Sequence, residues 1–149
     1  MKVIFLDTGP LGMVTHPRGN EQTRECAKWM SRLLRNGATF VLPEIADYEL
    51  RRALLLGEKK MGLTRLDSLK SAISYCQITT QAILKAAEFW ALARKRGKPT
   101  APDEALDGDV ILAAQAAGYK ADGREVIIAT TNVRHLEDFS NARLWQSIS

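Results

Sequence analysis

Short, wholly apolar runs alternate with longer helical patterns along the 149 residues of this chain, and this alternation limits the folds open to it. The runs VIFL (3–6), TFVL (39–42) and VIIA (126–129) are rich in strand-forming residues and have no polar face. Strands buried on both sides and separated by helices are typical of a parallel sheet with helices on each face. The sequence therefore predicts an α/β fold, a three-layer sandwich in which a central parallel sheet is flanked by helices.

The segments between these runs predict the remaining elements. Apolar residues at helical spacing predict helices over 21–35, 43–56, 64–74, 81–96 (capped by Thr80) and 109–117. The runs CQIT (76–79) and ARLW (142–145) are expected to be shorter strands. We expect a turn at DTGP (7–10) and a loop at GKPTAPDEALDG (97–108), with Asp103 and Glu104 on the loop surface. The length suits one domain over residues 1–149.

The composition narrows the class of protein. An apolar share of 46% suits a folded core, in which we expect Trp29, Trp90 and Trp145. The net charge of +4 leans mildly toward polyanionic partners. The two cysteines form no CxxC pair, which argues against a zinc site or a disulfide framework. No run resembles a signal peptide or reaches membrane-spanning length, so we expect a cytoplasmic protein without membrane association.

Four polar residues from distant parts of the sequence fall near the expected strand ends. Asp7 follows the first strand directly, and Asn132 follows the run VIIA. Glu49 lies in the helix after the second strand, and Asp109 opens the apolar run DVILAAQAA. Because the carboxyl ends of parallel strands share one edge of a sheet, we expect these four residues to converge there.

Each residue alone has a simpler explanation, but together they point to a cation. Asp7 and Asp109 suit a turn or a helix cap, and Glu49 could pair with a neighbouring arginine. Several carboxylates in one place repel each other unless some are protonated or a cation lies among them. An all-oxygen ligand set favours Mg²⁺ or Mn²⁺ over zinc. Such an ion activates water for attack on a phosphodiester, which suits a basic protein.

Four motifs in order resemble one known family. FLDTGPL, YELRRAL, DGDVILAAQA and IIATTNVRHLEDF resemble the PIN-domain ribonucleases, and among them the VapC-type toxins of toxin–antitoxin pairs. The resemblance runs over essentially the whole chain. It implies a parallel sheet between helices, and an endoribonuclease that cleaves single-stranded or structured RNA with Mg²⁺ or Mn²⁺. It also implies a homodimer and a small antitoxin protein as partner.

The resemblance also implies which residues act. The catalytic residues would be Asp7, Glu49, Asp109 and Asn132, and the three acids among them would be the metal ligands. The secondary candidates are Thr8, Asp107 and Thr130. Asn132 stands where many members have Asp, and Asp107 competes with Asp109 as a ligand; we favour Asp109 because its offset to VILAA matches the motif. In-line attack by a metal-bound water would leave a 3′-hydroxyl and a 5′-phosphate.

Other functions and contacts remain open at this stage. The chain could be a catalytically weak or inactive PIN-like binding module whose acidic pocket receives a basic residue of a partner. An Asp7-nucleophile phosphatase would need a second Asp two residues on, where the chain has Gly9. The arginines expected to contact the RNA backbone are Arg18, Arg51, Arg52 and Arg134. His135 is expected at the surface or in packing, and the RNA target is not predicted.

Overall fold

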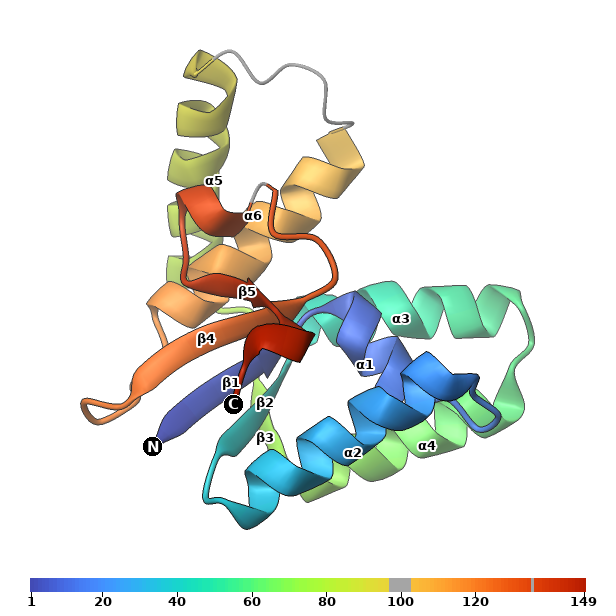
Figure 1. Ribbon diagram of the computed structural model, residues 1–149. Helices are drawn as coiled ribbons and strands as arrows, with labels where there is room; N and C mark the ends of the chain where they lie inside the picture. Colours follow the sequence, from blue (N-terminus) through green and yellow to red (C-terminus); the bar gives the residue numbers. More distant parts are fainter. Residues whose placement is uncertain (97–102, 135) are drawn as a thin grey trace.

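The computed structural model describes residues 1–96, 103–134 and 136–149, with the side chains of residues 103 and 104 outside that description (Figure 1). The strands of the described chain are β1 (Lys2–Leu6), β2 (Thr39–Pro43), β3 (Ser74–Cys76), β4 (Glu125–Thr130) and β5 (Ala142–Leu144). They form one parallel sheet in the order β3-β2-β1-β4-β5. The helices are α1 (Thr8–Val14), α2 (Glu21–Arg35), α3 (Glu44–Leu56), α4 (Lys60–Ala72), α5 (Thr80–Lys95) and α6 (Asp103–Ala117).

The central strand β1 is buried on both faces because its side chains alternate between two cores. Ile4 and Leu6 pack in the core beneath α1, α2 and α4, whereas Val3 and Phe5 pack in the core beneath α6. All four side chains are fully shielded from solvent. Helix α5 packs on α6 on that second side, as Figure 1 shows. The predicted three-layer α/β sandwich with a parallel central sheet is therefore confirmed.

The predicted turn at DTGP is wrong, because α1 begins there. Asp7 is the N-cap of α1 and accepts a hydrogen bond from the backbone N–H of Thr8 at 2.8 Å. Pro10 lies in the first turn, where the backbone N–H groups have no partner within the helix and a proline costs little. The strand β1 therefore leads straight into a helix.

Other expected boundaries also need correction, among them the start of α4, which begins at Lys60 instead of residue 64. Residues 103–108 are helical, so α6 begins at Asp103 and Asp109 lies inside the helix instead of opening it. The third strand is Ser74–Cys76, earlier than the expected 76–79. It ends level with the end of β2, and beyond it the N–H of Ile78 donates to Oε1 of Glu44 at 2.8 Å. Thr79, not Thr80, is the N-cap of α5.

No helix within the described ranges is long and apolar enough to cross a membrane.

Trp29 anchors the C-terminal end of the chain to the sheet. Its ring meets those of Phe40 and Trp145 edge-on, and its Nε1–H donates to the carbonyl oxygen of Ile148 at 2.9 Å. Trp29 and Trp145 are buried, as expected, but Trp90 is 37% exposed and the expectation of a core position for it is wrong.

Replacing Trp29 with Phe should therefore destabilise the protein. The variant loses buried volume and leaves the carbonyl of Ile148 without its donor, which together should lower the free energy of unfolding by about 2–3 kcal/mol. Urea unfolding followed by circular dichroism measures this change. The same substitution at Trp90, a partly exposed position on α5, should change it by less than about 0.5 kcal/mol. Equal effects of the two substitutions would contradict the anchoring role.

Candidate active site

Asp7 lies where β1 ends and is held by hydrogen bonds on both carboxylate oxygens. Oδ1 accepts from the backbone N–H of Thr8, at 2.8 Å, and Oδ2 accepts from the hydroxyl of Thr130, at 2.7 Å. Thr130 is the last residue of β4, the strand beside β1. Burial raises the pKa of Asp7 above its ordinary value, against the lowering effect of these two hydrogen bonds. Adjacent parallel strands thus bring a carboxyl group and a hydroxyl group together.

Glu49 reaches the same place from α3. Its Oε1 accepts a hydrogen bond from the hydroxyl of Thr8 at 2.9 Å, so that Thr8 contacts both Asp7 and Glu49. Burial raises the pKa of Glu49, the hydroxyl of Thr8 opposes this, the charge of Asp7 raises it further, and the charge of Arg52 lowers it. The two carboxyl groups therefore lie close enough for each charge to be felt by the other.

Asp109 is the third carboxyl group of this cluster and is half-buried on α6. Burial, followed by repulsion from Asp7 and then from Glu49, raises its pKa to about 7. Asp109 lies inside α6 and is repelled by acids of two other elements, which would not be the case for a helix cap at the surface. The simpler explanation of Asp109 as a cap is therefore wrong. We name Asp7, Glu49 and Asp109 the carboxylate site.

Asn132 lies near this site, but its side chain makes a local turn. Its backbone N–H donates to the hydroxyl of Thr130 at 3.1 Å, and its side-chain Oδ1 accepts from the N–H of Arg134 at 3.1 Å. Within the described hydrogen bonds, only the backbone of Asn132 reaches a residue that contacts Asp7. A direct ligand role for Asn132 stays a prediction.

Asp107 lies on a different side of α6 from Asp109. Two residues along a helix are separated by about 200° around its axis. Asp107 is exposed and lines a groove between α5 and α6, together with Ile83 and Trp90. The geometry therefore favours Asp109 over Asp107 as a member of the carboxylate site.

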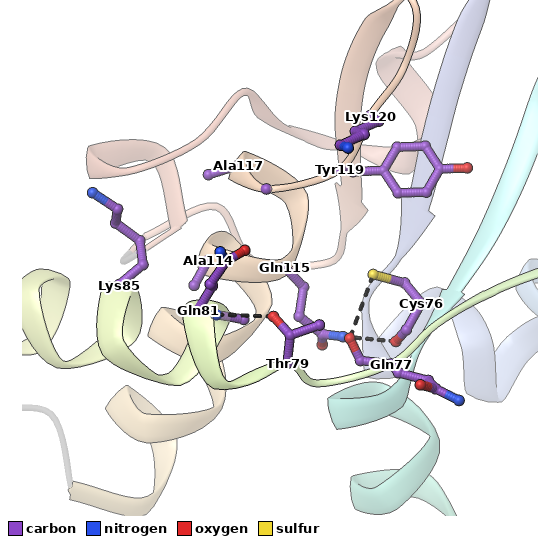
Figure 2. A pocket seen from close by; sticks show the side chains of 12 residues that line it. Cys76, Gln77, Thr79, Gln81, Lys85, Ala114, Gln115, Ala117, Tyr119 and Lys120 are labelled. Atoms are coloured by element: carbon purple, nitrogen blue, oxygen red, sulfur yellow. Dashed lines mark hydrogen bonds between the residues drawn. The ribbon is translucent and has the colours of Figure 1, made fainter.

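A separate cavity of about 370 Å³ lies between the end of β3, the start of α5 and the end of α6 (Figure 2). Gln115 is buried beside it, donating from Nε2 to the carbonyl of Cys76 at 2.7 Å and accepting from the N–H of Ile45 at 3.4 Å. Lys85 and Lys120 are its charged lining residues within the described chain. None of the predicted site residues lines it, so this cavity is not the candidate active site.

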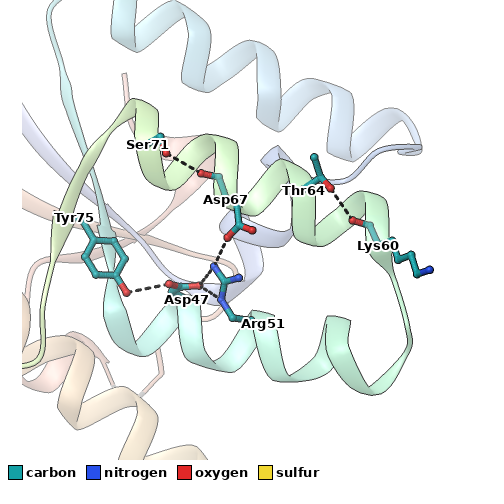
Figure 3. Close-up of polar contacts among 7 residues, drawn as sticks. All are labelled: Asp47, Arg51, Lys60, Thr64, Asp67, Ser71 and Tyr75. Carbon is teal, nitrogen blue, oxygen red and sulfur yellow. Dashed lines mark hydrogen bonds and ion pairs between the residues drawn. The ribbon is translucent and has the colours of Figure 1, made fainter.

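The predicted RNA contact Arg51 is bound within the protein (Figure 3). Its guanidinium forms ion pairs with Asp47 on α3, at 2.9 Å, and with Asp67 on α4, at 2.8 Å. Buried Asp47 also accepts a hydrogen bond from the hydroxyl of Tyr75, on β3, at 2.9 Å. The charge of Arg51 is therefore used to join α3 to α4 rather than offered to a ligand.

The other predicted basic contacts differ in their placement. The guanidinium of Arg52 lies over the ring of Tyr48, 4.9 Å from its centroid, and its charge reaches Glu49. Arg18 and Arg134 are exposed. His135 lies outside the described residues.

The carboxylate site has the donor chemistry that Mg²⁺ and Mn²⁺ prefer. Its ligands would all be carboxylate oxygens, and a divalent ion would relieve the repulsion that raises the pKa of Asp109. As the side chains lie, no three acids, histidines or cysteines of the described ranges are close enough together to hold an ion. A carboxylate offers about four lone pairs, so the hydrogen bonds to Asp7 and Glu49 leave each able to turn an oxygen toward an ion.

Solved structures share this fold over nearly the whole chain. VapBC2 from Rickettsia felis bound to a promoter DNA fragment aligns with a TM-score of 0.68 at 15% identity, covering 95% of this chain and 96% of that one. VapBC-1 from nontypeable Haemophilus influenzae gives 0.67 at 16% identity, and DNA-bound VapBC from Salmonella typhimurium gives 0.65 at 20%, each covering 97% of this chain and 99% of the other.

At these identities the likeness is one of fold. It confirms that the chain has the PIN-like α/β fold of VapC-type proteins that the four sequence motifs resemble. No known family profile and no curated protein sequence matches the chain.

Sequence reasoning missed one feature of this site, the close approach of Gly108 to Glu49. Gly108 lies against the carboxyl group of Glu49, and a methyl group there would lie 2.6 Å from Oε2. The available signal was Gly108 itself, because glycine is disfavoured inside a helix. That signal is visible only once residues 103–108 are known to be helical. The influence of Arg52 on Glu49 agrees in part with the simpler explanation given above, in which Glu49 pairs with a neighbouring arginine.

The pKa of Asp109 predicts a pH-dependent effect of removing its charge. The folded-state pKa of about 7 exceeds the ordinary value of 3.8, so ionisation of Asp109 opposes folding and stability is lost as the pH rises between these values. In metal-free protein at pH 8, Asp109→Asn should raise the free energy of unfolding by about 1–3 kcal/mol, after allowance for partial exposure. Chemical denaturation at several pH values measures this.

The gain from Asp109→Asn should shrink as the pH is lowered to about 5, where more of the wild-type group is protonated. Asp107→Asn, an exposed change on the same helix, should alter stability by less than about 0.5 kcal/mol at either pH. A loss of stability in Asp109→Asn at pH 8 would contradict the repulsion described here.

Proposed function

We propose that this chain is a metal-dependent endoribonuclease of the PIN-domain type, and the toxin of a toxin–antitoxin pair. The observation that carries the proposal is the convergence of three buried or half-buried carboxyl groups, from the end of β1, from α3 and from α6. Their mutual repulsion lacks a full counter-charge from the protein, and the VapBC-like fold supports the same function. We propose a cytoplasmic location.

Each residue of the site has a role in this proposal. Asp7, Glu49 and Asp109 would hold Mg²⁺ or Mn²⁺, with Asn132 as an additional ligand close by. The bound ion supplies an activated water and stabilises negative charge on the phosphate. Thr8 keeps Asp7 and Glu49 in fixed relation through its N–H and hydroxyl, and Thr130 orients Asp7 from the neighbouring strand. Arg52 lies close enough to Glu49 to attract an RNA phosphate toward the same edge.

A small antitoxin is the proposed protein partner, since the three similar solved structures are VapBC proteins. An apolar groove of about 500 Å³ beside α1 and α3, lined by Met13, Leu50 and Leu54, would suit an apolar segment of such a partner. It includes Gly9, two residues from Asp7, so a partner lying in it would reach the carboxylate site. We also propose a homodimer, as the resemblance to VapC-type toxins implies.

The direct test of the nuclease is loss of RNA cleavage on removal of one site charge. Asp7→Asn keeps an acceptor for the N–H of Thr8 but removes the negative charge, so it should cleave single-stranded RNA on the order of 100-fold more slowly in Mn²⁺. Cleavage is followed on a gel with purified protein. Asp107→Asn is the matched control and should retain wild-type rates. Undiminished cleavage by Asp7→Asn would contradict the proposal that Asp7 belongs to a nuclease site.

A catalytically inactive binding module is the second candidate. It is favoured by one observation, that no three candidate ligands of the described chain lie within reach of one ion as placed. In that case the carboxylate site would receive a basic side chain of the partner. Calorimetry with Mn²⁺ distinguishes the two functions: the nuclease requires heat of binding that Asp109→Asn reduces, and the binding module gives none.

A further inference from the structure

Gly108 lies in the interior of helix α6, where glycine lowers the stability of a helix. It is the sixth of the fifteen residues of α6 and is buried. A glycine inside a helix is less stable than an alanine by about 0.5–1 kcal/mol. Elsewhere α6 has alanine at buried positions that pack in the core, as at Ala113, Ala114 and Ala116. Its neighbours must explain why position 108 lacks even a methyl group.

The space that a methyl group would fill at Gly108 is occupied by one carboxyl group. A Cβ atom there would lie 2.6 Å from Oε2 of Glu49, 3.3 Å from its Cδ and 3.5 Å from its Oε1. The three nearest atoms all belong to this one side chain. The backbone does not require glycine, because the glycines of the described chain with positive φ are Gly37 and Gly123. Contact with Glu49 is therefore the constraint on position 108.

We infer that Gly108 is a positioning residue, whose missing side chain keeps the carboxyl group of Glu49 against α6 beside Asp109. On its other side, Glu49 accepts the hydroxyl of Thr8 at 2.9 Å. The carboxyl group is thus confined between α1 and α6, and these two contacts fix where its oxygens point. The consequence for metal binding rests on the proposed function; the position of the Glu49 carboxyl group does not.

Gly108→Ala should separate stability from site geometry. The clash involves only the end of a flexible side chain, so Glu49 swings away and the protein folds. Better helix propensity should then raise the Tm of the metal-free protein by about 1–4 °C or leave it unchanged. The affinity for Mn²⁺, measured by calorimetry, should fall about 10- to 100-fold, as when the support of a metal ligand is lost. If Gly108 only served packing, Gly108→Ala would lower the Tm and the affinity for Mn²⁺ together.

A double-mutant cycle tests whether Gly108 acts through Glu49. In the Glu49→Ala background the obstructed side chain is gone, so adding Gly108→Ala should change the affinity for Mn²⁺ by less than about twofold. Gly118→Ala is the matched control at the end of α6. A methyl there would make only an ordinary contact, 3.6 Å from the carbonyl oxygen of Ala114, and it should leave affinity unchanged.

A metal-free measurement separates failure of this inference from failure of the proposed function. In carbon-13 NMR spectra, Gly108→Ala should shift the carboxyl resonance of Glu49 and the side-chain resonances of Thr8, and Gly118→Ala should shift neither. If wild-type protein binds no Mn²⁺ but these shifts appear, the metal proposal fails and the positioning role stands. Unmoved resonances, wild-type affinity in Gly108→Ala, an equal loss in the Glu49→Ala background, or failure of Gly108→Ala to fold would each overturn the inference.

Discussion

The two hydrogen bonds donated by Thr8 are the contacts on which the carboxylate site depends. Its N–H binds Asp7 as α1 begins, and its hydroxyl binds Glu49 on α3. These bonds form only because β1 lies between β2 and β4 in the sheet, so that the helix following β2 and the end of β4 both flank the end of β1. The strand order thus determines which side chains meet there.

Two acids on α3, Asp47 and Glu49, differ in whether a cation of the protein is paired with them. Both are shielded from water to some degree, but Asp47 has an ion pair with Arg51 and a hydrogen bond from Tyr75. Glu49 instead has a threonine hydroxyl, a repelling neighbour in Asp7, and the more distant charge of Arg52. A buried carboxylate is stable when a cation of the protein neutralises it. The chain thus pairs Asp47 with a cation of its own and gives the neighbouring carboxylate site no ion pair of that kind among the described residues.

Much of the fold was predictable because its signals are local and strong. The run VIFL became β1, the helix over 21–35 has the expected bounds, and Asp7 follows β1 as predicted. The convergence of Asp7, Glu49 and Asp109 followed from parallel topology, and their mutual electrostatic influence agrees with it. Neither the local turn of Asn132 nor the pairing of Arg51 with Asp67 could be predicted, because both depend on three-dimensional neighbours that spacing does not reveal.

Two of the errors in secondary structure fall on segments that contribute residues to the carboxylate site, and these two have a physical cause. DTGP was expected to be a turn and DEALDG part of a loop, yet both contribute residues to helices. In each segment, glycine and acidic residues that normally indicate turns lie within a helix or at its start. A Cβ at Gly9 would lie 2.8 Å from the side chain of Thr131, and one at Gly108 would meet Glu49. Propensity rules describe what stabilises a helix alone, so they fail where close approach between elements decides the residue. Gly108, which lies inside α6 next to the carboxyl group of Glu49, is such a case.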